Sequence, residues 1–101
     1  MFIVDGEKLS LTRGDDAYLY VGATLAAGEV LEFRVFRDSG LTDLLFARGR
    51  LPDGSFLVQK HDTAPLPFGV LLWYEVVKID ANEDEAVVLG PETLTVMEEV
   101  H

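Results

Sequence analysis

The chain has 101 residues, of which 49% are hydrophobic and 26% are charged, so there is room for one packed domain, placed here over residues 1–101. Because it has no cysteine and only two histidines, a thiolate metal site is excluded and little imidazole is left for general base chemistry. The formal net charge of −10 repels a phosphate backbone, which argues against a nucleic-acid partner. The acidic residues are spread along the chain, and this distribution favours a solubilising surface over an acidic face made for one basic partner.

The sequence also argues against a membrane partner. No run of about 18 apolar residues occurs, as a membrane span would require. Asp5, Glu7 and Lys8 interrupt the first fifteen residues, so this segment does not have the pattern of a signal peptide. We expect synthesis in the cytoplasm, with export only as part of an assembly.

The first half of the chain alternates with a period of two, which predicts short strands. The alternation covers residues 8–12 and 17–21, and Leu31, Phe33 and Val35 then face opposite to Glu32, Arg34 and Phe36. Turn residues separate these segments at 13–16, 27–29 and 38–40. The segment 41–50 has some helical spacing, but it is short and lies between Gly40 and Gly49, so we expect a strand or an irregular crossover.

The second half continues the pattern. Pro52-Asp53-Gly54 predicts a turn, and residues 56–60 predict a strand after it. Residues 61–101 indicate a turn, a long apolar strand, an acidic hairpin loop and two further strand segments. The run from Val70 to Trp73 is apolar at every position, which is typical of a strand covered on both faces.

These segments predict an all-β fold, an antiparallel sandwich of about seven or eight strands. We expect Leu31, Phe33, Val35 and Val76 in the shared core. No helix longer than about three turns is expected.

Candidate catalytic and metal-binding groups are few, and we expect no enzyme activity, no cofactor and no metal site. The loop that begins at Asp80 has alternating oxygen ligands, as a calcium loop does. However, the places that require glycine and a bidentate glutamate hold Glu85 and Pro91, so a polar hairpin loop is favoured. The serines lie in no nucleophile-elbow pattern.

Aromatic residues and the last strand supply the candidate interface. On the strand containing Trp73 and Tyr74, one ring must face outward, and the favoured interpretation buries Trp73 and places Tyr74 at the surface. The alternative is an exposed aromatic docking patch together with Phe36 or with Tyr18 and Tyr20. The last strand, with Leu94 and Val96, is a candidate free edge for pairing with another chain, where Glu98 and Glu99 would discourage random stacking.

Several segments together resemble a known family. Over essentially its full length, the chain resembles small phage and prophage proteins of Gram-positive bacteria that are related to the immunoglobulin-like N-terminal domain of baseplate upper proteins. The matching segments are Leu9-Ser-Leu-Thr-Arg-Gly-Asp15, Leu31-Glu-Phe33-Arg-Val35, Asp62-Thr63, Leu66-Pro-Phe-Gly69, Tyr74-Glu-Val76 and Glu98-Glu99-Val100. Gly69 and Tyr74 are one residue further apart than is usual in the family, which predicts a bulge or shifted register near Trp73.

The resemblance implies a virion protein of the tail or baseplate, without catalytic residues. Its partners would be other tail or baseplate proteins, or further copies of the same chain in a homo-oligomer. Two hypotheses of other classes stay open. One is a module that binds carbohydrate or a host surface through Trp73, Tyr18 and Tyr20. The other is an acidic inhibitor that mimics nucleic acid.

Overall fold

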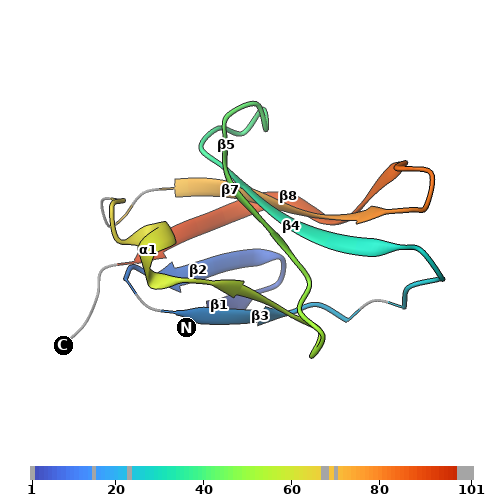
Figure 1. Cartoon of the computed structure of the whole chain (residues 1–101). Coiled ribbons are helices and arrows are strands. Elements are labelled where there is room, and N and C mark those ends of the chain that lie inside the picture. Colours follow the sequence, from blue (N-terminus) through green and yellow to red (C-terminus); the bar gives the residue numbers. More distant parts are fainter. Residues whose placement is uncertain (1, 15, 23, 67–68, 70, 98–101) are drawn as a thin grey trace.

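The period-two segments of the sequence form the strands of a two-sheet structure, described by a computed structural model for residues 2–14, 16–22, 24–66, 69 and 71–97 (Figure 1). Alternate apolar side chains favour strands because one face of each strand can be buried while the other faces water. The elements follow in chain order as β1 (Phe2–Asp5), β2 (Lys8–Thr12), β3 (Ala17–Tyr20), β4 (Val30–Phe36), β5 (Leu44–Gly49), β6 (Ser55–Val58), α1 (Lys60–Thr63), β7 (Leu71–Ile79) and β8 (Glu85–Met97).

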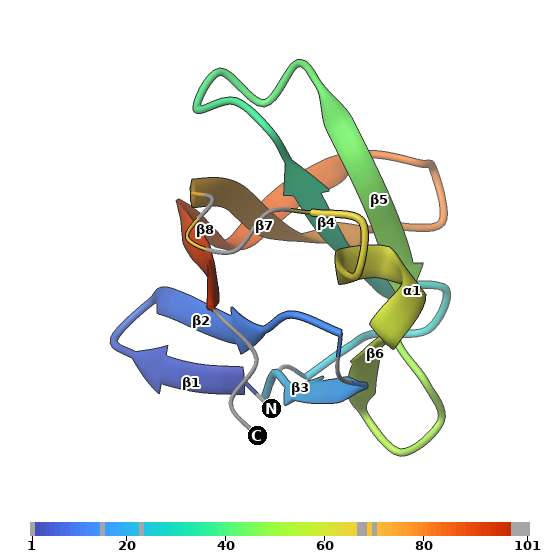
Figure 2. The same cartoon turned by 90° about the vertical axis from the view of Figure 1, so that its left-hand side faces the viewer.

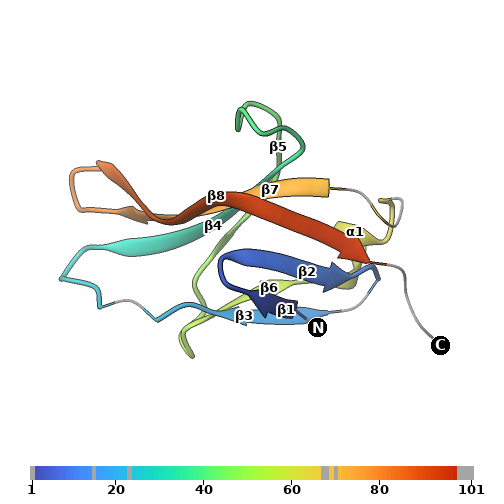
Figure 3. The same ribbon diagram turned by 180° about the vertical axis from the view of Figure 1, so that it is seen from behind.

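The strands form two sheets, and the predicted all-β sandwich is confirmed. The larger sheet has six strands in the order β1-β2-β8-β7-β4-β5, and β3 pairs with β6 in the smaller one. The expectation of a wholly antiparallel arrangement is wrong for one pair, because β2 runs parallel to β8. Figure 3 shows these two strands side by side and pointing the same way. A parallel pair needs a long connection between its strands, and here nearly the whole chain separates them.

The six-stranded sheet curves around the smaller one. Figure 2 shows β1 beside β3 and β5 beside β6, so the two margins of the larger sheet approach the two strands of the smaller sheet. The space between the sheets is filled by one cluster of apolar side chains drawn from both of them. We call the side of the larger sheet that faces this cluster its core face, and the opposite side its outer face.

Phe33 lies at the centre of the core. Its ring stacks on Tyr74 at 5.7 Å with an interplanar angle of 9°, and it also contacts Phe56 at 5.8 Å and Phe2 at 6.2 Å. The four residues predicted for the core are buried there, as expected: Leu31, Phe33, Val35 and Val76. Aromatic contacts at these distances stabilise a core beyond the burial of their area.

Strand β7 is not covered where its apolar run begins. Leu71 is 49% exposed, whereas Tyr74, Glu75, Val76 and Val77 form a run of buried residues further along. The prediction of cover on both faces is therefore wrong at Leu71, and two-sided burial occurs instead in the middle of the strand. The register of β7 with β8 shifts on either side of Val76, close to Trp73, where the resemblance predicts an irregularity.

The strand predicted over residues 56–60 ends at Val58, and α1 follows it. Asp62 explains this early end, because its carboxylate accepts the Gln59 N–H at 2.9 Å in a capping box. The helix is bonded to the β2–β3 loop, since Thr63 Oγ1 accepts the Gly14 N–H at 2.9 Å and Asp16 Oδ1 accepts the Lys60 N–H at 2.7 Å.

Among the described residues, the structure contains no helix with the length and apolar character of a membrane span. The predictions made for Pro67, Phe68, Val70, Glu98 and Glu99 fall outside the described residues.

Candidate interaction surface

The six candidate interface residues do not form one patch. Tyr18 and Tyr20 are 52% and 67% exposed on β3, where Leu19 points into the core, so both rings lie on the outside of the smaller sheet. Phe36 and Trp73 are paired neighbours on the outer face of the larger sheet, but Phe36 is only 7% exposed, so its prediction as an exposed docking residue is wrong. The sandwich core separates these two locations, and we therefore treat them as distinct surfaces.

The last strand does not supply a free edge at Leu94 and Val96, where β2 pairs with it. Strand β8 lies between β2 and β7, and both Leu94 and Val96 are 0% exposed in the core. The edge interpretation of these two residues is therefore wrong. The reason is that β2 pairs in parallel with β8 and so occupies the backbone hydrogen-bonding groups that a free edge would expose.

The strand that contains Trp73 faces the opposite way from the favoured interpretation. Tyr74 is 1% exposed in the core, and Trp73 is half-buried on the outer face. The Tyr74 hydroxyl donates a hydrogen bond to the backbone carbonyl of Glu7, so the ring can be buried without leaving its polar group unpaired. Burial raises the pKa of Tyr74 to about 12, and the nearby carboxylates of Glu7 and Glu92 add to the shift.

Four cross-strand pairs form a ladder along the outer face between β4 and β7. From one end to the other they are Phe36–Trp73, Arg34–Glu75, Glu32–Val77 and Val30–Ile79. The ladder is apolar at both ends and charged in the middle. Leu71 and Leu44 extend the aromatic end, with 49% and 52% of their surface exposed.

The charged middle of the ladder is a cluster of three carboxylates around one guanidinium. Arg34 donates two hydrogen bonds of 2.9 Å to Glu85 on β8 and one of 2.5 Å to Glu32, and its Nη1 lies 3.6 Å from Glu75. These bonds raise the pKa of Arg34, with Glu85 first, and hold the pKa of Glu85 below its usual range. Three carboxylates to one guanidinium leave an excess of two negative charges at this place.

The same cluster explains the burial of Val77, which is 1% exposed although it lies outside the core cluster. Arg34 pairs with Glu75 and Glu85 pairs with Ile79, so the bridge from Arg34 to Glu85 spans the position of Val77 between them. Long charged side chains can cover apolar surface in this way while their charged ends stay near water.

The period-two pattern of the sequence does not reveal this cluster. The pattern places Glu32 and Arg34 on the outward side of their strand, but it indicates no role for Glu75 or Glu85. A glutamate within the apolar run Tyr74-Glu75-Val76 is a signal, because a buried carboxylate needs a partner. The identity of that partner depends on the register of β4 with β7, which the sequence does not show.

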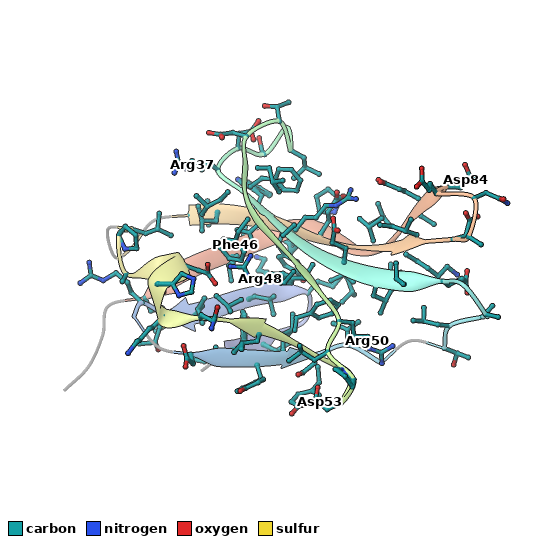
Figure 4. All side chains as sticks on the ribbon, in the orientation of Figure 1. Arg37, Phe46, Arg48, Arg50, Asp53 and Asp84 are labelled. Atoms are coloured by element: carbon teal, nitrogen blue, oxygen red, sulfur yellow. The ribbon has the colours of Figure 1, made fainter. Side chains whose placement is uncertain are left out.

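A second buried carboxylate, Asp62 on α1, has a structural role. Its side chain is 7% exposed and is paired with Arg48 of β5, whose guanidinium lies 5.0 Å from the centre of the Phe46 ring (Figure 4). Together with the Gln59 N–H, these contacts use the Asp62 oxygens within the molecule. Asp62 therefore fastens α1 to the edge of the sheet.

The charged loop tips lie far from one another. Figure 4 shows Arg37 on the β4–β5 loop, Asp53 on the β5–β6 turn and Asp84 on the β7–β8 hairpin, at three separate extremities. The hairpin interpretation of the acidic segment is confirmed, since Asp80 Oδ1 accepts the N–H groups of Asn82 and Asp84 at 2.8 and 3.0 Å. Within the part of the chain that the structure describes, no group of three acidic or histidine side chains is arranged to hold a metal ion, and no pocket opens.

Comparison with known proteins gives no match, either to a family model or to a curated protein. The fold and the surface geometry are therefore the observations on which a functional assignment can be built.

Proposed function

We propose that the chain is a non-catalytic structural or assembly protein of a phage or prophage tail or baseplate, and that it acts through protein–protein contacts. It would be made in the host cytoplasm and carried in the virion. The tail assignment and the immunoglobulin-like subclass of sandwich rest on the sequence resemblance. The docking role rests on the outer face of the larger sheet.

One observation supports docking at this face. Figure 1 shows that the side of β4, β7 and β8 facing away from β1 and β3 has the β4–β5 loop and the start of β5 rising at one place, with no second sheet packed on it. Yet this side has Leu71 at 49%, Val30 at 56% and Val87 at 54% exposure, together with the half-buried Trp73. A sandwich needs only one apolar face per sheet, so a second one of this kind is typical of a surface that another protein covers.

The test is whether the chain enters tail particles through this face. Tails are purified from the phage or prophage that carries the gene, with the chain bearing a small tag. We expect the chain in the tail fraction, and we expect Leu71→Ser to remove it, whereas Val4→Ser on β1 does not. Val4 is a matched control because it is 60% exposed on another strand. Complete, infectious tails assembled without the chain would refute the proposal.

The exposed tyrosine pair favours a second candidate, a module that binds carbohydrate of a host surface. Tyr18 and Tyr20 lie two residues apart on one face of β3, so their rings can stack on successive sugars of a glycan. A glycan array is the test. We expect binding by the wild-type chain and its loss in Tyr18→Ala and Tyr20→Ala, and a wild-type chain that binds no glycan would exclude this candidate.

A further inference from the structure

We propose that the partner on the outer face presents a lysine or arginine flanked on both sides by apolar side chains. This inference rests on the proposed docking role and names the chemistry of its partner. It follows from the order of the outer face, in which the half-buried Trp73 and the exposed Leu71 at one end and the exposed Val30 at the other enclose the charged cluster. A complementary surface must have the same order with the opposite sign of charge.

The cluster has more acceptor groups for a cation than donor groups for an anion. Arg34 already faces Glu32, Glu75 and Glu85, and its side chain is only 19% exposed. Two of the carboxylates stay accessible, since the side chain of Glu85 is 50% exposed and that of Glu32 is 33% exposed. With two negative charges in excess, an approaching basic group gains attraction, and an acidic group meets repulsion at close range.

The same charges argue against a second copy of this chain on this face. A two-fold contact through this face would bring two copies of the same negatively charged cluster into one interface, because an isologous interface is formed by the same patch of both subunits. Each guanidinium is occupied by its own three carboxylates, so neither copy could neutralise the other. Three of the acidic residues that are dispersed in the sequence thus lie together on the outer face, where their charge favours a basic partner.

Trp73 makes the inference measurable, because it is the only tryptophan of the chain and lies on the outer face beside the cluster. Its fluorescence reports on this face without a label. The probes are three synthetic peptides of equal length that alternate valine with lysine, serine or glutamate. We expect the lysine peptide to change Trp73 emission with the highest affinity and the glutamate peptide to have no effect. Added NaCl should weaken the lysine complex by screening.

Two variants separate the cluster from the general charge of the protein. Glu85→Gln removes an exposed carboxylate of the cluster, and Asp84→Asn removes the same charge from the adjacent hairpin tip. We expect Glu85→Gln to weaken lysine-peptide binding by about two- to fivefold, the range of one exposed ion pair, and Asp84→Asn to change it by less. Equal loss in both variants, or equal binding of all three peptides, would overturn the inference.

The remaining outcomes identify which proposal fails. If Trp73 emission changes with protein concentration alone and NaCl strengthens the change, a second copy occupies the face and the basic partner is wrong. If none of the peptides binds but the Leu71→Ser variant is still absent from the tail particles, the docking role stands and only the partner chemistry is refuted. If the lysine peptide binds as expected but the chain is absent from tails, the surface stands and the tail assignment falls.

Discussion

The two faces of the six-stranded sheet are both partly buried, but for different physical reasons. On the core face, Phe33, Tyr74 and Val76 are enclosed by side chains of the opposing sheet. On the outer face, the ion pair of Arg34 with Glu85 spans the position of Val77, and Trp73 is half-buried. Adjacent residues with nearly equal exposure, such as Val76 at 0% and Val77 at 1%, therefore have different neighbours and should respond differently to mutation and salt.

The largest expected effect is on the core face. Phe33→Ala removes the ring at the centre of the aromatic cluster and should lower the free energy of unfolding by about 3–5 kcal/mol, through lost transfer energy and a residual cavity. Urea unfolding followed by circular dichroism measures the change. A loss below about 1 kcal/mol would place Phe33 outside a tightly packed core, since surface substitutions fall in that range.

Arg34→Gln should have the next largest effect, because it leaves Glu75, 8% exposed, without its cation. We expect a loss of about 1–3 kcal/mol, smaller in high salt. Arg37→Gln removes a charge from an exposed loop and should change stability by less than about 0.5 kcal/mol. Equal effects of the two arginine variants would contradict a cohesive cluster on the outer face.

The contribution of the cluster to stability should also depend on pH in the acidic range. The bond to Arg34 holds the pKa of Glu85 below its usual range, so the pKa is lower in the folded than in the unfolded chain. The resulting stabilisation is present above the unfolded pKa and is lost as the pH falls through the folded one. The stability difference between wild type and Arg34→Gln should therefore shrink as the pH falls across that range, and unfolding midpoints at several pH values would show this.

Tyr74→Phe keeps the ring on the core face and removes only the bond to the Glu7 carbonyl, so we expect a loss of about 0.5–1.5 kcal/mol. Burial raises the Tyr74 pKa from 10.0 to about 12. A raised folded pKa gives a stabilisation that is complete below pH 10.0 and declines as the pH rises towards 12. The alkaline decline should be weaker in Tyr74→Phe, and tyrosinate absorbance would detect the late titration in the wild type.

The smallest effect on stability is expected from Leu71→Ser, which changes the exposed end of the outer face. Its free energy of unfolding, obtained from a thermal melt, should match that of the wild type to within about 0.5 kcal/mol. The same variant is nevertheless expected to be absent from the tail particles. A large destabilisation would mean that Leu71 is a packing residue, and it would remove the contrast between the two faces.

The sequence alone determined the fold class and much of the core. The alternation of Leu31, Phe33 and Val35 required one buried face, and it did so whichever strands lay beside them. Turn residues such as Pro52-Asp53-Gly54 likewise act locally, and β5 ends before that turn while β6 begins after it. Such features depend on neighbours a few residues away, so a linear pattern contains them.

Only the tertiary structure decided which strands are free and which charges meet. Leu94 and Val96 lie inside the sheet because β2, at the other end of the chain, pairs with β8. Tyr74 rather than Trp73 faces the core because the pairing of β7 with β4 sets the direction of both side chains. The cluster of Arg34 with Glu75 and Glu85 joins three strands in the same way. Pairing over such distances depends on the sum of many contacts, and no local residue pattern records it.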